Sequence, residues 1–152
     1  MTRRQKAEEN FMQGYNCSQS LVLAFSDLTG MQEDALLKLS SGFGGGMGRL
    51  REVCGAVSGM FIIASILFGY SDPKDKHKKD DLYIKIQQLG LELENKRGSI
   101  VCRDLLNLDV KHDSPVSSER TSNFYDVRPC MKIIGDAAEI LENFLKNNGL
   151  IK

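Results

Sequence analysis

Hydrophobic residues recur along most of this chain at intervals of three and four, the spacing that places them on one face of a helix. A sustained alternation of apolar and polar residues, which would indicate a half-buried strand, is missing from the sequence. The prolines, Pro73, Pro115 and Pro129, lie outside the strongly periodic stretches, where they do not interrupt a helix. The pattern therefore predicts an all-α protein.

Breaks in the periodic pattern give the predicted helix boundaries. Gly14 ends a first helix and Gly98 a later one, because glycine adopts the left-handed backbone at a helix end easily. Asn16 is a suitable N-cap, and Pro129 suits the first turn of the last helix. The predicted helices cover about residues 3–13, 16–30, 32–40, 52–71, 82–96, 99–106 and 129–147.

Three segments lack the helical pattern and are predicted to be loops. Residues 40–49 read SSGFGGGMGR, and each of these glycines would cost a helix interior about 1 kcal/mol relative to alanine. Residues 71–81 are charged and mixed in sign, and residues 109–128 are polar and irregular. A loop as long as 109–128 within a compact domain is often functional or mobile.

The longest uncharged stretch, residues 53–71, is close to the length that crosses a bilayer. Glycine, serine and cysteine residues dilute its hydrophobicity, so we do not expect insertion into a membrane. Helices that are apolar on every side are usually interior ones. We therefore predict a central apolar helix within a single-domain helical bundle that covers residues 1–152.

Composition narrows the class of protein. A chain of 152 residues with 41% hydrophobic and 26% charged residues suits one soluble globular domain. Twenty basic residues balance twenty acidic ones, which argues against nucleic-acid binding. The N-terminus lacks the apolar segment of a secretory signal, so we expect a cytoplasmic protein. The glycine-rich, apolar centre is also compatible with a homodimer.

The cysteines are the candidate chemistry of this sequence. Each falls in or near the first turn of a predicted helix, where the partial positive charge of the helix N-terminus favours thiolate over thiol. No CxxC motif is present, so a shared site requires the fold to gather them from distant positions. We expect at least three to lie close together. They are Cys17, Cys54, Cys102 and Cys130, and the arginines nearest to them in sequence are Arg51, Arg103 and Arg128.

Glycines flank the second cysteine on both sides. Glycine-rich loops before a helix can bind phosphate, but the strand and the lysine of the known nucleotide motifs are missing here. Because glycine has no Cβ, another helix or a cofactor can approach its backbone closely. Tight helix packing and cofactor contact are therefore the two interpretations for Gly44, Gly45, Gly46, Gly55 and Gly59.

The sequence CGAVSG at residues 54–59, preceded by GFGGGMGR, resembles the C–GCAxxG–C–C family, whose members are described as redox-active proteins. Members are about as long as this chain and carry four cysteines. Cys17 matches the early cysteine of the family, and Cys102 and Cys130 match the two later ones. The resemblance spans about residues 14–145 and implies redox chemistry with an unidentified redox partner or small-molecule oxidant.

Three functions remain open on this evidence. The first is thiol–disulfide or electron-transfer chemistry by the four cysteines, with no bound cofactor required, which would make the protein a thiol-dependent oxidoreductase. The second is a metal site in which the same four thiolates bind zinc or an iron–sulfur cluster. The third is a helical interaction module with structural cysteines. His77 and His112 lie in charged segments, where we expect solvated residues and not ligands or bases.

Overall fold

The computed structural model describes the backbone of residues 1–152 and every side chain except those of Asp126 and Val127. Throughout this backbone the ordered elements are helices and no strand occurs, which confirms the all-α prediction. The elements are α1 (Arg3–Met12), α2 (Cys17–Leu23), η1 (Ser26–Leu28), α3 (Glu33–Ser40), η2 (Ser41–Phe43), α4 (Gly44–Met47), α5 (Gly55–Phe68), α6 (Lys76–Arg97), α7 (Cys102–Leu105), α8 (Ser122–Val127) and α9 (Cys130–Asn147).

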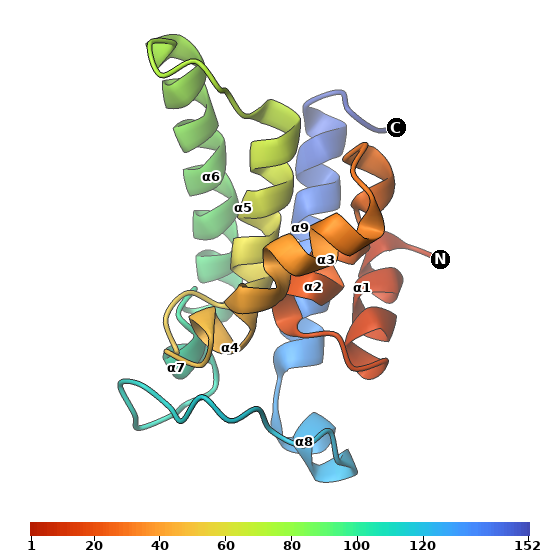
Figure 1. Cartoon of the computed structure of the whole chain (residues 1–152), viewed down its shortest axis with the longest axis vertical. Helices are drawn as coiled ribbons and strands as arrows, with labels where there is room; N and C mark the ends of the chain where they lie inside the picture. The colour runs from red at the N-terminus through yellow and green to blue at the C-terminus, as the bar shows by residue number, and fades with distance from the viewer.

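Helices α5, α6 and α9 lie side by side along the long axis of the molecule, and α1 packs on the other side of α9 (Figure 1). Helix α2 contacts both α5 and α9. Leu21, Met60, Leu89, Leu93 and Leu141 are fully buried where these helices meet. Burial of such side chains contributes about 1.5–3 kcal/mol each, so this core is the main stabilising element of the bundle.

Two glycines of α5 allow α2 to pack unusually close to it. A Cβ on Gly59 would lie 3.0 Å from the Leu21 Cβ and 3.2 Å from the Ser18 carbonyl oxygen. A Cβ on Gly55 would lie 3.0 Å from the Cys17 Cβ. The close approach therefore brings the first residue of α2 against the first turn of α5, which places Cys17 and Cys54 in the same region.

The uncharged stretch around residue 60 forms a shorter helix than the sequence predicts. Helix α5 begins at Gly55 and ends at Phe68, because the backbone of Gly69 is extended. Eight of its 14 residues are buried. Of the helices that the structure describes, none is both long enough and apolar enough to span a membrane.

Several other predicted boundaries are wrong. Residues 76–81 are helical and not a loop, because the Asp75 side chain caps α6 by accepting from the Lys78 N–H at 3.1 Å. Within this charged turn, Lys76 pairs with Asp80 one helical turn away, which supports the helix. Residues 122–127, also predicted as loop, form α8, which Thr121 caps. Helix α2 ends at Leu23, well before Gly30, and is followed by the short turn η1.

Candidate functional site

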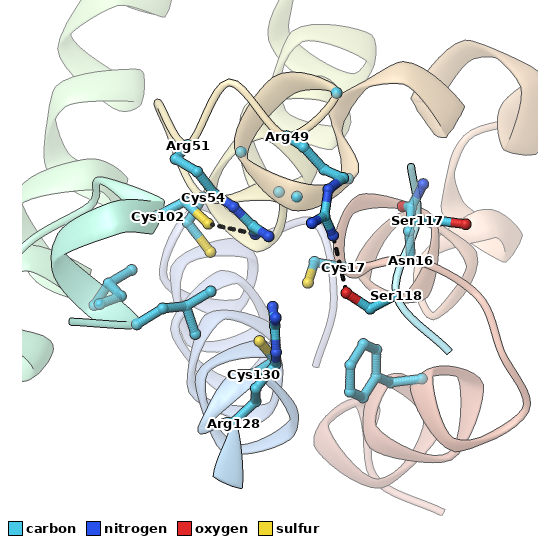
Figure 2. Close-up of a pocket in the computed structure, with 18 of the residues that line it drawn as sticks. Asn16, Cys17, Arg49, Arg51, Cys54, Cys102, Ser117, Ser118, Arg128 and Cys130 are labelled. Carbon is cyan, nitrogen blue, oxygen red and sulfur yellow. Dashed lines mark hydrogen bonds between the residues drawn. The ribbon is translucent and has the colours of Figure 1, made fainter. Parts of the chain in front are cut away.

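A cavity of about 270 Å³ lies at one end of the bundle, and all four cysteines line it. Figure 2 shows the sulfur atoms of Cys17, Cys54, Cys102 and Cys130 around this cavity, although the residues come from four separate helix starts. The structure therefore confirms the prediction that the cysteines lie together. All four are free thiols.

The predicted position of the cysteines at helix starts is also confirmed. Cys17, Cys102 and Cys130 are the first residues of α2, α7 and α9, and Cys54 is the N-cap of α5. Asn16 caps α2 as predicted, since its side chain accepts from the Gln19 N–H at 2.9 Å. Helix N-termini thus direct their partial positive charge toward this cavity from several sides.

A short backbone pairing that the sequence did not reveal brings Cys54 and Cys102 together. Val53 and Val101 form an isolated antiparallel bridge. On either side of it, the Cys54 N–H donates to the Ile100 carbonyl at 2.8 Å and the Cys102 N–H donates to the Glu52 carbonyl at 2.6 Å. The bridge is too short to leave an alternating pattern of apolar and polar residues.

The glycine-rich segment forms a left-handed turn at the wall of the cavity. Residues 45–49 all have positive φ, which is 67° for Met47 and 71° for Arg49. Arg51, two residues later, also has a positive φ of 60°. A left-handed backbone costs about 1–2 kcal/mol for each residue other than glycine. The turn passes very close to α7, because a Cβ on Gly46 would lie 2.5 Å from the Cys102 Cβ. This strained turn directs Arg49 and Arg51 into the cavity (Figure 2).

The predicted glycine contacts divide into two groups. Gly44, Gly45, Gly46 and Gly55 line the cavity, and their role toward a cofactor stays a prediction. Gly59 lies outside the cavity lining and packs against Leu21, as the helix-packing interpretation expects.

Four arginines line the cavity together with the cysteines: Arg49, Arg51, Arg120 and Arg128. Arg51 is only 1% exposed, and its Nη1 lies 3.5 Å from the Cys102 Sγ. Its Nη2 donates to Asp113 at 2.9 Å, and Arg49 donates to the same carboxylate oxygen at 3.1 Å. The hydrogen bond from Arg51 lowers the pKa of Asp113, so this carboxylate is ionised at neutral pH.

Arg120 and Arg128 complete the set of arginines that line the cavity. Arg120 donates to the carbonyl groups of Phe11 and Tyr15, both at 3.0 Å, and stacks 4.4 Å from the centre of the Phe11 ring. Arg128 lies 4.9 Å from the centre of the Phe124 ring. These aromatic contacts hold two cations at the site without neutralising them.

Sequence reasoning identified only part of this arginine cluster. The sequence places Arg51, Arg103 and Arg128 near cysteines. Arg51 and Arg128 line the cavity, but Arg103 pairs with Glu52 and does not line it. Arg120 and Asp113 belong to the segment predicted as a functional or mobile loop, and the length of that loop was the only signal for them. His77 and His112 are exposed and lie outside the cavity lining.

The surroundings of the four thiols give them different pKa values. A hydrogen bond from Cys17 lowers the pKa of Cys130, and the charges of Arg128, Arg51 and Arg120 lower it further, which outweighs the opposing effect of burial. The hydrogen bond with Cys130 and burial raise the pKa of Cys17 well above its ordinary value.

The other two thiols are buried and weakly acidic. Burial raises the pKa of Cys54 to about 12, although the nearby backbone N–H groups of Ala56 and Val57 act against this. Burial also raises the pKa of Cys102, and the hydrogen bond from Arg51 only partly offsets it. Cys130 is therefore the thiol of this site that ionises most readily.

The described side chains do not support the metal-site alternative. Among them, no group of three or more histidine, cysteine, aspartate or glutamate residues is arranged to hold a metal ion. Although the four cysteines share the cavity, arginine side chains lie among them (Figure 2). The geometry thus offers a cationic pocket with thiols in its wall and not a compact set of four sulfur ligands.

A comparison with protein-family models finds one whose description is "Putative redox-active protein (C_GCAxxG_C_C)", and it matches residues 15–144. The chain belongs to this family. The match covers all four cysteines and the left-handed glycine turn, which confirms the resemblance seen in the sequence. No curated protein and no solved structure matches the chain.

Proposed function

We propose that Cys17 and Cys130 form a redox-active dithiol that alternates between two thiols and one disulfide. The observation that carries this proposal is that the two thiols line one cavity from the first residues of α2 and α9, where their interaction lowers the pKa of Cys130 and raises that of Cys17. Such a pair has one thiolate ready to attack and one protonated partner beside it. This is the combination that thiol–disulfide exchange requires.

Cys130 is the attacking residue of the pair. Its sulfur is at the N-terminus of α9, an 18-residue helix, whereas Cys17 begins the seven-residue α2. The charges of Arg128, Arg51 and Arg120 act on Cys130 and stabilise its thiolate. The interaction with the Cys17 thiol also favours this thiolate.

The proposed reaction oxidises the dithiol and reduces a disulfide substrate. The Cys130 thiolate attacks one substrate sulfur, so that a mixed disulfide forms, the substrate S–S bond breaks and the first substrate thiolate leaves. Cys17 then loses its proton, attacks the Cys130 sulfur and displaces the second substrate thiolate. Two protein thiols become one disulfide, and the two protons that they lose balance the two thiolates released.

The acidity of Cys17 suits the second step. Its pKa is raised mainly by its hydrogen bond to Cys130 and by burial, with a further contribution from the negative charge of Cys130. Once Cys130 is in a mixed disulfide, that charge is gone and the pKa of Cys17 falls. The resolving thiolate therefore forms after the first step and not before it. The proposed reaction does not involve Cys54 or Cys102.

The test is to map the disulfide that forms. The fully reduced protein is treated with bis(2-hydroxyethyl) disulfide, free thiols are blocked with N-ethylmaleimide, and the peptides are identified by mass spectrometry. We expect a Cys17–Cys130 disulfide that dithiothreitol reverses. The Cys17→Ser variant should stop at a mixed disulfide on Cys130, and the Cys54→Ala variant should react as the wild type does.

Two results would overturn this assignment. One is a product in which Cys130 stays reduced while Cys54 and Cys102 are oxidised. The other is stoichiometric zinc or iron in protein purified without oxygen, with all four thiols protected from the blocking reagent, because the cysteines would then be ligands.

A further inference from the structure

The cavity beside the dithiol is strongly cationic. Four arginines line it, and neither lysine nor a carboxylate is among the lining residues that the structure describes. Asp113, which bridges Arg49 and Arg51 from outside the lining, can neutralise only one of the four charges. A cavity wall of this composition attracts anions and disfavours cations.

Arg51 presents hydrogen-bond donors that its neighbours do not fully use. A guanidinium has five N–H donors, and Asp113 and Cys102 take three of those of Arg51 among the described side chains. The side chain is almost fully buried, and its end points toward the middle of the cavity (Figure 2). The donors that remain can bind an anionic acceptor inside the cavity.

The reacting sulfur lies within this cationic region. Arg128 precedes Cys130 by two residues, and its guanidinium stands beside the Cys130 sulfur in Figure 2. The Arg51 side chain approaches from the opposite wall. An anionic group bound between these arginines places the atoms next to it at the attacking thiolate.

We propose that the substrate of this site is a small disulfide with a carboxylate close to its sulfur atoms. The proposal deepens the proposed function and rests on it. The cavity volume of about 270 Å³ lies just below the usual range of about 300–1,000 Å³ for small-molecule sites, which fits a small disulfide better than a folded protein substrate. The arginines bind the carboxylate, and Cys130 attacks the neighbouring sulfur.

This charge preference is opposite to that of a simple thiolate in water. Two negative charges repel, so a carboxylate next to the disulfide slows attack by an isolated thiolate. In this cavity the arginines outweigh the repulsion. The preference for an anionic disulfide is therefore a property of the site, and it can be separated from the intrinsic reactivity of the reagent.

Three symmetric disulfides of similar length provide the test: dithiodiglycolate, which carries two carboxylates, neutral bis(2-hydroxyethyl) disulfide and cationic cystamine. The rate of oxidation of the reduced protein by each is divided by its rate with free 2-mercaptoethanol. After this correction we expect dithiodiglycolate to react at least about tenfold faster than the neutral probe. A tenfold difference corresponds to the contribution of about one charge-assisted hydrogen bond. Cystamine should be the slowest.

Variants and salt show whether the arginines cause the preference. Arg128→Gln should reduce it several-fold, whereas Lys78→Gln, which removes an exposed charge on α6, should leave it unchanged. Rising salt should reduce the preference of the wild type, a readout that does not depend on any variant folding.

The outcomes separate the two proposals. If the Cys17–Cys130 disulfide forms with all three probes at equal corrected rates, or fastest with cystamine, the substrate class is wrong and the dithiol function stands. If none of the probes produces that disulfide, the dithiol function itself fails and the substrate class fails with it.

Discussion

The Cys17 and Cys130 thiols line the same cavity, although the two residues begin helices near opposite ends of the chain. Their interaction lowers the pKa of Cys130 and raises that of Cys17. It depends on α2 and α9, which pack against each other in the core. The acidity of Cys130 is thus a property of the assembled bundle.

The donor on Cys17 can be removed or kept by substitution. Cys17→Ala deletes it, so the pKa of Cys130 should rise, whereas Cys17→Ser retains a hydroxyl donor and should keep the pKa low. The measurement is the pH dependence of Cys130 alkylation by iodoacetamide, followed by peptide mass spectrometry. Equal pH profiles for both variants and the wild type would show that the contact does not govern Cys130.

Native-state alkylation should rank the thiols by acidity and burial. At neutral pH we expect Cys130 to react first, because its pKa is lowered and its side chain is partly exposed. Cys54 should react last, because it is buried and its pKa is about 12. In guanidinium chloride this ranking should disappear. Faster modification of Cys54 than of Cys130 in the native protein would contradict the site described above.

The packing of α2 on α5 should be sensitive to one added methyl group. Gly55→Ala places a Cβ 2.9 Å from the Phe43 carbonyl oxygen and 3.0 Å from the Ser18 nitrogen, both of which are backbone atoms. We expect a loss of about 1–3 kcal/mol in the free energy of unfolding, measured by urea denaturation. Gly42→Ala is the matched control, because no atom lies within 4 Å of its added Cβ. Similar stability of the two variants would refute the close packing.

Asp136 should make the stability of the bundle depend on pH. Burial alone would raise the pKa of Asp136, but hydrogen bonds from Arg4 and Arg97 outweigh it and the pKa is lowered. A carboxyl group with a lowered native pKa stabilises the fold fully above its unfolded pKa, about 3.9, and this contribution is lost as the pH falls toward the native value.

Asp136→Asn tests this linkage. We expect the variant to lose about 1.5–3 kcal/mol at neutral pH, the range for hydrogen bonds to charged groups, and to lose less than the wild type on acidification below about pH 4. Urea unfolding at a series of pH values measures both effects. An unchanged slope of stability against pH would exclude Asp136 as the source.

Asp113 should hold the segment after α7 against the cavity. It accepts from Arg49 and Arg51, and its own N–H donates to the Arg49 carbonyl at 3.0 Å. Asp113→Asn should therefore increase tryptic cleavage at Lys111 or Arg120 in the native protein. Asp109→Asn removes an exposed carboxylate from the same segment and should leave the cleavage rate unchanged. Equal cleavage of the two variants would show that the ion pairs do not order this segment.

The sequence alone determined the helical class and the position of the thiols. Apolar spacing predicts helices, and Asn16 and Pro129 mark the starts of α2 and α9 where Cys17 and Cys130 follow. These are local signals, because capping and helix periodicity involve residues within one or two turns of each other. The start of α6 is not predicted from the sequence, because the charged residues that form its cap and ion pairs are also typical of a solvated loop.

Only the tertiary structure decided which groups surround the thiols. The shared cavity of Cys17 and Cys130, the bridge between Val53 and Val101, and the approach of Arg120 each join segments that are distant in the chain. Electrostatic effects on a pKa act across space at short range, so no sequence interval reveals them. For the same reason, four cysteines of similar local setting become one acidic thiol, one weakly acidic partner and two buried neighbours only when the bundle is folded.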